Sequence, residues 1–360
     1  MTLTDKIDAF TTLGKYLKQF TVSGFMENPE LKYLNTRFAK NTLDLIKDVH
    51  LNNPWFIPEF VTHSLNSLAI ALEEKNIIHW LSEYPEMGKK KNKPMNIGVI
   101  MAGNIPLVGF HDFISILLSG NTITARLSTK DDKLLPALSA ILNDIHPGFR
   151  ELVSFEEVLQ KDTDAVIATG SDNSARYFEY YFRNKPHIIR KNRNSTAILT
   201  GSESGTELKL LAEDIFLYFG LGCRNVSKLY LPANYHIPGL LDRFNHYAWL
   251  ANHNKYTNNY EYQRAIFLIN QIRHFDTGFL LIKEDPSYNS PIGCLHYEFY
   301  ENPCKLRQKL DADAGILQCI VSQSQNNSKE IEFGKSQKPM LWNYADNIDT
   351  FKFLLNLSQK

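Results

Sequence analysis

Cys223 is the residue whose type and surroundings are best suited to nucleophilic chemistry. It follows an apolar run that ends at Gly220 and Gly222, so its side chain is expected on a tight turn. Only a thiolate attacks a carbonyl carbon, and the pKa of an unperturbed cysteine, about 8.5, must be lowered by nearby positive charge or helix N-terminal amides. Arg224 supplies a neighbouring cation. The alternative is that Cys223 is a small buried hydrophobic residue, the usual role of a cysteine among apolar neighbours.

The segment before this cysteine has the spacing of an amphipathic helix. Its apolar residues recur at helical spacing at Leu208, Leu211, Ala212, Ile215, Phe216 and Phe219. We expect a helix that runs to the two glycines and anchors the cysteine turn against a core.

From Met95 onward strands alternate with helices, which is typical of βαβ units and a mainly parallel sheet. The expected strands are 96–101, 122–127 and 165–168, and the expected helices are 107–118, 131–145 and 171–182. Asn104 follows the first strand, at the carboxyl end where open α/β sheets bind their ligands. Gly170 and Ser171 open the third helix, whose free N–H groups favour a phosphate; a plain helix capped by Ser171 is the alternative.

Length, composition and charge describe an ordinary globular protein, expected to form two domains. The chain has 360 residues, 43% hydrophobic and 22% charged, and its 39 basic residues equal its 39 acidic ones. With no net charge to attract it, nucleic acid is not an expected partner. The four cysteines show no CxxC spacing, which argues against zinc and against a disulfide framework and favours a reducing cytoplasm. Neither a signal peptide nor an apolar run of 18 residues is present, so no membrane span is expected.

Four short motifs, in the same order, resemble those of the aldehyde dehydrogenase superfamily and, within it, of the LuxC-type fatty acyl-CoA reductases. Ala102-Gly-Asn-Ile-Pro106 is similar to the family's Pro-Trp-Asn-x-Pro, and residues 120–128 to its Gly-Asn-x-x-x-x-Lys-Pro-Ser. Ala168-Thr-Gly-Ser171 is similar to Phe-Thr-Gly-Ser, and Gly220-Leu-Gly-Cys223 to Gly-Gln-x-Cys. Phe333-Gly-Lys-Ser-Gln337 weakly resembles the family's late Phe-Gly segment.

This resemblance implies an aldehyde dehydrogenase-like α/β fold with a Rossmann-like cofactor domain and an α/β catalytic domain. The expected parts are a helical segment at 1–94 packed on the cofactor domain at 95–203, a catalytic domain at 204–339, and a tail at 340–360. The catalytic domain should contain strands at 227–231, 279–282, 295–299 and 317–321. The amphipathic run 340–357 is expected to pack on the first domain. The Lys89 to Lys93 run, which precedes the strand expected at 96–101, is expected to be a solvated linker or a phosphate patch.

The resemblance also implies roles for individual residues. Cys223 attacks an acyl carbonyl, and the side-chain amide of Asn104 with the Cys223 N–H holds the oxyanion, unless Asn104 only forms an Asx turn. The cofactor-binding residues would be Arg126, Ser128, Lys130, Gly170 and Ser171. Thr129 stands where NAD-preferring relatives carry a Glu, so flanking positive charge favours NADPH over NADH; a solvated helix start is the alternative for Lys130.

The segment 190–199 departs from the family pattern in an informative way. Arg190 stands where the family has the Glu that activates water, and a guanidinium, being always protonated, cannot act as a general base. Poor hydrolysis with an intact nucleophile favours reduction of a thioester of coenzyme A or of an acyl carrier protein. A Cys-dependent acyltransferase or a non-catalytic acyl-binding relative is the alternative, and a homo-oligomer is compatible with either.

Six aromatic residues of the later region have two interpretations. They line an acyl channel or, as their helical spacing favours, pack in a core; they are Tyr247, Trp249, Tyr256, Tyr260, Tyr262 and Phe267.

Overall fold

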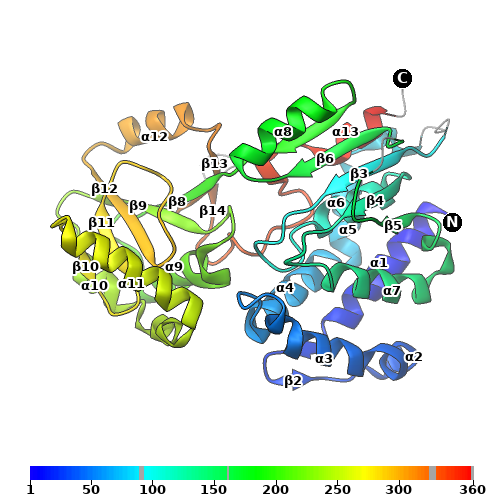
Figure 1. Cartoon of the computed structure of the whole chain (residues 1–360), viewed down its shortest axis with the longest axis horizontal. Coiled ribbons are helices and arrows are strands. Elements are labelled where there is room, and N and C mark those ends of the chain that lie inside the picture. Colours follow the sequence, from blue (N-terminus) through cyan, green and yellow to red (C-terminus); the bar gives the residue numbers. More distant parts are fainter. Residues whose placement is uncertain (89–92, 160–161, 324–329, 358–360) are drawn as a thin grey trace. The chain divides into compact units, whose positions relative to one another are not determined.

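The computed structural model describes residues 1–88, 93–159, 162–323 and 330–357, in two compact units (Figure 1). Unit 1 comprises Met1–Lys191 and Pro339–Lys360, and unit 2 comprises Asn192–Lys338. Of the basic run Lys89 to Lys93, all but the last residue lie outside the described ranges. Within those ranges, no helix is long and apolar enough to cross a membrane.

Unit 1 begins with helices that share one core with its sheet. They are α1 (Leu3–Leu17), α2 (Lys32–Leu34), α3 (Lys40–Asp48), α4 (Pro58–Ala71) and α5 (Glu74–Ser82), with a short hairpin of β1 (Phe20–Thr21) and β2 (Gly24–Phe25). Thr2 caps α1 through a capping box with Asp5. The Phe10 ring meets the rings of Phe113 and Phe149 edge-on at centroid distances of 6.4 and 5.7 Å. The N-terminal helices are therefore part of the hydrophobic core of unit 1.

The sheet of unit 1 has five parallel strands in the order β5-β4-β3-β6-β7. The strands are β3 (Asn96–Ile100), β4 (Thr122–Arg126), β5 (Val153–Phe155), β6 (Ala165–Thr169) and β7 (His187–Arg190), and the helices between them are α6 (Phe110–Leu118), α7 (Leu134–Ile145) and α8 (Asp172–Phe182). In chain order this is 3-2-1-4-5, the Rossmann arrangement, whose strand order reverses between β3 and β6. The carboxyl ends of β3 and β6 are the place where such sheets bind ligands.

The chain returns to unit 1 at its carboxyl end. There α13 (Thr350–Leu357) packs on α6, and the Phe351 ring lies 4.7 Å from that of Trp80. The Tyr344 hydroxyl accepts a hydrogen bond from the Trp80 indole N–H at 2.6 Å. The amphipathic closing run thus belongs to the same core as the N-terminal helices.

Unit 2 is built on a seven-stranded sheet of order β10-β11-β12-β9-β8-β13-β14. The strands are β8 (Asn194–Ile198), β9 (Val226–Pro232), β10 (Phe275–Asp276), β11 (Leu281–Glu284), β12 (Cys294–Tyr300), β13 (Leu317–Val321) and β14 (Glu330–Ile331); its helices include α9 (Gly205–Phe216), α10 (Ile237–Asp242), α11 (Asn254–Ile269) and α12 (Pro303–Ala312). The described pairs are parallel except β10 with β11.

Several boundaries differ from those expected from the sequence. The helices expected at 107–118 and 131–145 begin at Phe110 and Leu134, and the strand expected at 279–282 is Leu281–Glu284. Two further differences bear on the site. Residues 194–198, expected in the cofactor domain, form β8, which pairs with β9 and β13 and so belongs to unit 2. The helix before the cysteine turn ends at Phe216, not at the glycines, because the next residues leave helical geometry.

Candidate active site

The turn that carries Cys223 begins with three successive residues in the left-handed region. Ser204 caps α9 through a capping box, and after Phe216 the φ angles of Tyr218, Phe219 and Gly220 are 55°, 57° and 75°. A bulky side chain at positive φ is strained by about 1–3 kcal/mol, so it persists only where the surroundings hold it, often at functional sites. Here the Phe219 ring stacks on that of His253 at 4.2 Å.

Asn225, almost fully buried, fixes this turn through its side-chain amide. Its Nδ2 donates to the carbonyls of Leu217 at 2.8 Å, Asp214 at 3.2 Å and Ile215 at 3.3 Å, and its Oδ1 accepts from the Gly222 N–H at 2.8 Å. It satisfies carbonyls that the end of a helix leaves without partners. One side chain therefore joins the end of α9 to the residue before Cys223.

Ser195, on β8, fixes the other side of the cysteine. Its hydroxyl donates to the Cys223 carbonyl at 2.9 Å and accepts from the Cys319 N–H at 3.3 Å. The Cys319 sulfur lies 3.0 Å from the same oxygen, and because the serine proton is already committed, the Cys319 thiol is the donor. Burial raises the pKa of Cys319 to about 11, which keeps it a thiol at neutral pH.

The four cysteines, none of them in a disulfide, differ in accessibility. Cys319 and Cys294 are buried, and burial raises the pKa of Cys294 to about 12. Cys304 is exposed at the start of α12, and Cys223 alone of the four is half-buried on a constrained turn. That combination of access and constraint is what a nucleophile needs.

The Phe333 to Gln337 segment packs on α9, the helix that leads to the Cys223 turn. The carboxylate of Asp214, fully buried, accepts the N–H groups of Gly334 at 2.6 Å and Ser336 at 3.0 Å. Burial is the main cause that raises the Asp214 pKa to about 6, against the opposing effect of these hydrogen bonds. Gly334 has φ +78°, and a Cβ there would lie 2.8 Å from a methyl of Leu210. Only glycine suits this close approach.

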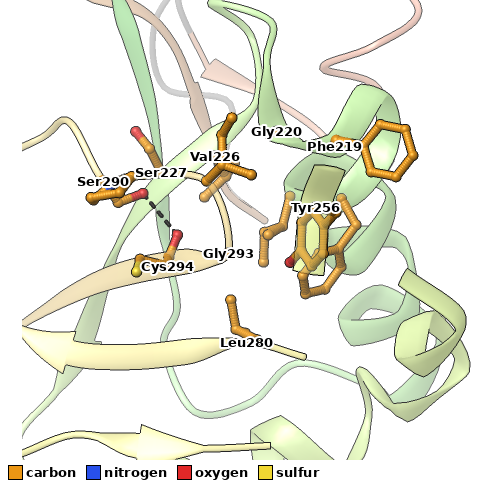
Figure 2. Close-up of a pocket in the computed structure, with 13 residues that line it drawn as sticks. Phe219, Gly220, Val226, Ser227, Tyr256, Leu280, Ser290, Gly293 and Cys294 are labelled. Atoms are coloured by element: carbon orange, nitrogen blue, oxygen red, sulfur yellow. Dashed lines mark hydrogen bonds between the residues drawn. The ribbon is translucent and has the colours of Figure 1, made fainter. Parts of the chain in front are cut away.

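A small pocket of about 30 Å³ lies beside the cysteine turn (Figure 2). Its walls include Phe219, Gly220, Tyr256 and Cys294, but Cys223 is not among the lining residues. Of the six aromatic residues singled out in the sequence, Tyr256 is the one that lines it. Several of the others pack in the core or lie at the surface, such as Tyr247 against Phe216 at 4.9 Å and Tyr262 at 64% exposure. Core packing is thus the main role of this set.

In unit 1, Asn104 lies exposed in the loop between β3 and α6. The loop approaches the segment after β4 so closely that a Cβ on Gly103 would lie 2.6 Å from the Ser128 Oγ. At its far end Leu107 has φ 59° and donates its N–H to the Asp131 carboxylate at 2.8 Å.

Three of the residues expected to bind the cofactor lie at the carboxyl end of β4, namely Arg126, its last residue, and Ser128 and Lys130, which follow it. Arg126 is exposed, and its Nε donates to the Glu157 carbonyl at 3.0 Å. The Ser128 Oγ accepts the Lys130 N–H at 3.3 Å, and Lys130 is exposed. An exposed guanidinium and an exposed ammonium on one short segment provide positive charge for an anionic ligand.

Gly170 and Ser171 form the turn between β6 and α8. Ser171 is the N-cap of α8 and accepts the Ser174 N–H at 3.3 Å. A Cβ on Gly170 would lie 2.9 Å from the Ser174 Cβ and 3.0 Å from the Phe178 ring. Glycine therefore lets the strand meet the helix closely, as the turns that cradle a dinucleotide phosphate require. The residues present fit such a group.

Arg190, at the carboxyl end of β7, is buried and forms a bidentate ion pair with Asp112 of α6, at 2.6 and 2.8 Å. It also donates to the Thr350 hydroxyl of α13 at 2.8 Å. The Gly170 N–H donates to the Arg190 carbonyl at 3.2 Å, so Arg190 lies at the same sheet edge as the β6 turn. Its guanidinium joins a strand, a helix and the closing helix in the core of unit 1.

Within unit 1, β3 lies between β4 and β6, so the loops that bear Asn104, Ser128 and Gly170 emerge at one sheet edge. Cys223 belongs to unit 2. In the ranges that the structure describes, no group of three or more His, Cys, Asp or Glu side chains is arranged to hold a metal ion. The sequence reasoning missed the supporting residues, which are Ser195, Asp214 and Asn225 in unit 2 and Asp131 in unit 1. Asn225 stands in the turn that follows Gly220 and Gly222, where Asn commonly binds the backbone. The other three pair with residues distant in the sequence.

The sequence matches no family model and no curated protein. Solved structures do match, with low identity. An aldehyde dehydrogenase from Bacillus cereus, in its NAD+ complex, is 13% identical with a TM-score of 0.61, over 91% of this chain and 72% of that one. An NAD-dependent aldehyde dehydrogenase from Sinorhizobium meliloti is 10% identical with a TM-score of 0.61 over 94% and 73%, and an indole-3-acetaldehyde dehydrogenase complexed with NAD+ is 12% identical with 0.57 over 90% and 77%.

These likenesses establish the class of fold. The chain has an aldehyde dehydrogenase-like α/β fold, with a Rossmann-like unit and a second α/β unit that bears the cysteine turn. The fold expected from the sequence is confirmed.

Proposed function

We propose that this protein is an NADPH-dependent reductase of acyl thioesters that works through an acyl-enzyme on Cys223, as in the LuxC-type branch of the superfamily. The observation that carries the proposal is the ion pair of Arg190 with Asp112. At the position where aldehyde-oxidising members of the superfamily have a water-activating carboxylate, this chain has a buried guanidinium that is paired with Asp112 in the core.

In the proposed reaction the Cys223 thiolate attacks the carbonyl carbon of the thioester. The side-chain amide of Asn104 and the backbone N–H of Cys223 donate to the oxyanion. Collapse of the tetrahedral intermediate breaks the bond to the donor sulfur, and the donor leaves as a thiol after it takes up a proton. The new thioester on Cys223 keeps the acyl group, so no water is consumed.

The reduced nicotinamide, when bound, supplies a hydride to the thioester carbon. Release of the aldehyde then regenerates the Cys223 thiolate, and the balance is acyl thioester, NADPH and one proton to aldehyde, free thiol and NADP+. At position 190 this chain offers no general base, since the Arg190 guanidinium cannot take a proton from water.

The residues at the sheet edge of unit 1 suit a nicotinamide dinucleotide. The start of α8 at Ser171, with Gly170 before it, presents N–H groups to a phosphate. Arg126 and Lys130 flank Thr129 with positive charge, which suits a 2′-phosphate and supports NADPH over NADH as the preferred cofactor. The neighbours solved with NAD+ support the class of cofactor.

The substrate we propose is a fatty acyl thioester of coenzyme A or of an acyl carrier protein. We place the reaction in the cytoplasm, where the four cysteines, none of which is in a disulfide, would stay reduced. A second copy of the chain in a homo-oligomer is compatible with this mechanism.

The proposal is tested by the ultraviolet absorbance of the reduced nicotinamide in the presence of a long-chain acyl-CoA. A reductase consumes NADPH and yields aldehyde in equal amount, and the Cys223→Ala variant does neither while it still binds cofactor. If the wild type transfers the acyl group to another thiol without consuming NADPH, the protein is an acyltransferase instead. If it does not react at all, it is a non-catalytic relative.

A further inference from the structure

The loop that bears Asn104 and the segment that follows β4 are held together by one buried carboxylate. The Asp131 side chain, 7% exposed, accepts the N–H of Leu107 at 2.8 Å through Oδ2. Its other oxygen, Oδ1, is buried and has no hydrogen-bond partner among the described residues. A buried carboxylate with one oxygen unsatisfied costs free energy, so its retention needs a reason.

The contact holds a strained residue. Leu107, three positions after Asn104, has φ 59°, which is unusual for a bulky side chain. Pro106 precedes it, and the carbonyl of Leu107 accepts the N–H of Phe110 at the start of α6. The hydrogen bond to Asp131 therefore fixes the reversal of the chain between Asn104 and the helix.

Two further contacts join the same segments. Gly103 packs on Ser128 so closely that a Cβ would collide with its hydroxyl, and a Cβ there would also lie 3.2 Å from the Asp131 N. The two segments thus touch at both ends, at Gly103 and at Leu107.

The N-terminal helical region holds both segments in place. Asn53 donates through Nδ2 to the Lys130 carbonyl at 3.2 Å, and the Ser64 hydroxyl of α4 donates to the Pro106 carbonyl at 2.9 Å. The first part of the chain, which carries no recognisable chemistry of its own, thereby supports the edge of the sheet where ligands bind.

We propose that Asp131 is a positioning residue that locks the loop bearing Asn104 onto the segment 126–131. The lock is a property of unit 1 alone, whereas its effect on the reaction rests on the proposed function. Burial, the largest cause, raises the Asp131 pKa to about 7, and the charge of Asp132 acts in the same direction. Oδ2 can accept from the Leu107 N–H in the neutral and in the charged form of the carboxyl group, so the contact does not depend on its protonation state.

Hydrogen–deuterium exchange of the peptide that contains Leu107 tests the lock directly, without substrate or cofactor. In Asp131→Ala the Leu107 amide loses its acceptor, and we expect its exchange to quicken about tenfold or more, the size of a lost buried hydrogen bond. Asp131→Asn keeps an acceptor oxygen and should stay within about threefold of the wild type. Asp132→Ala, a matched control at the exposed neighbour that pairs with Lys133, should leave the exchange unchanged.

The second measurement is the rate at which a long-chain acyl-CoA acylates Cys223. We expect Asp131→Ala to slow acylation about tenfold or more, because Asn104 is no longer held, and Asp131→Asn to restore most of the rate. Equal exchange in Asp131→Ala and wild type would overturn the lock, whatever the activity. A wild type that is never acylated would overturn the proposed function instead, while the exchange measurement still decides the role of Asp131.

Discussion

The side-chain amide of Asn225 donates a hydrogen bond of 2.8 Å to the carbonyl of Leu217, the first residue after α9. The same side chain accepts the Gly222 N–H, so it spans the turn from the end of the helix to the residue before Cys223. The position of the cysteine thus depends on a residue that does no chemistry.

Asn225→Asp should disable the cysteine turn, although it changes few atoms. The carboxylate has no N–H to give and faces the carbonyls of Asp214, Ile215 and Leu217, so we expect a loss of at least about 2 kcal/mol in the free energy of unfolding. Alkylation of Cys223 under native conditions should change in rate, because the turn relaxes. Asn259→Asp on α11, whose half-buried side chain donates to a carbonyl of its own helix, is the matched control and should change neither. Unchanged stability and alkylation in Asn225→Asp would show that the turn is held by other contacts.

Removal of Arg190 should be costly because it leaves Asp112 buried without its partner. For Arg190→Ala we expect the free energy of unfolding to fall by about 3–5 kcal/mol, and for the double variant Arg190→Met with Asp112→Leu we expect most of it to return. Denaturant unfolding measures both. Lys191→Ala, which breaks the neighbouring exposed pair with Glu179, should cost less than about 1 kcal/mol. A double variant no more stable than Arg190→Ala would mean that the ion pair is not what holds this part of the core.

Asp131 should make stability depend on pH in a definite direction. The pKa of Asp131 is raised from 3.8 to about 7 in the folded protein. The contribution of its neutral form to the free energy of unfolding is therefore fully present below pH 3.8 and is lost as the pH rises through about 7. Between pH 3.8 and about 7, the free energy of unfolding of the wild type should fall by roughly 2–4 kcal/mol relative to that of Asp131→Asn. Asp214, with a pKa of about 6, is the same in both proteins and cancels in the difference. A constant difference across this range would place Asp131 in a more solvated setting.

Cofactor preference should respond to a single change beside Arg126 and Lys130. The carboxylate of Thr129→Glu would repel a 2′-phosphate and could bind ribose hydroxyls. We therefore expect kcat/KM with NADPH to fall, by an amount equivalent to up to a few kcal/mol of transition-state stabilisation, while kcat/KM with NADH is kept or improved. Both cofactors are compared in the wild type and the variant. Equal losses with the two would place this segment away from the ribose.

The sequence was informative where chemistry and periodicity coincide. Alternation and length placed β3, β4 and β6 within a residue or so, and the glycine of the β6 turn is where the backbone needs it. The closing amphipathic run proved to be part of unit 1, as its pattern indicated.

The features that the sequence hid depend on distant partners. Helical periodicity extends through Phe219, but packing against His253 and the hydrogen bonds of Asn225 turn the backbone to positive φ first. Arg190 pairs with Asp112 and Thr350, residues 78 and 160 positions away, which no local pattern reveals. Residues 194–198 likewise belong to the second sheet because they pair with β9 and β13, which are distant in the sequence.

The most direct test of the central claim is the fate of the acyl group without reduced cofactor. Wild-type protein is mixed with a long-chain acyl-CoA, quenched at successive times and measured by intact mass, and the modified peptide is identified. We predict one acyl group on Cys223 that persists until NADPH is added and then leaves as aldehyde. Acylation at Cys294, Cys304 or Cys319, or rapid release of free fatty acid without NADPH, would contradict the account.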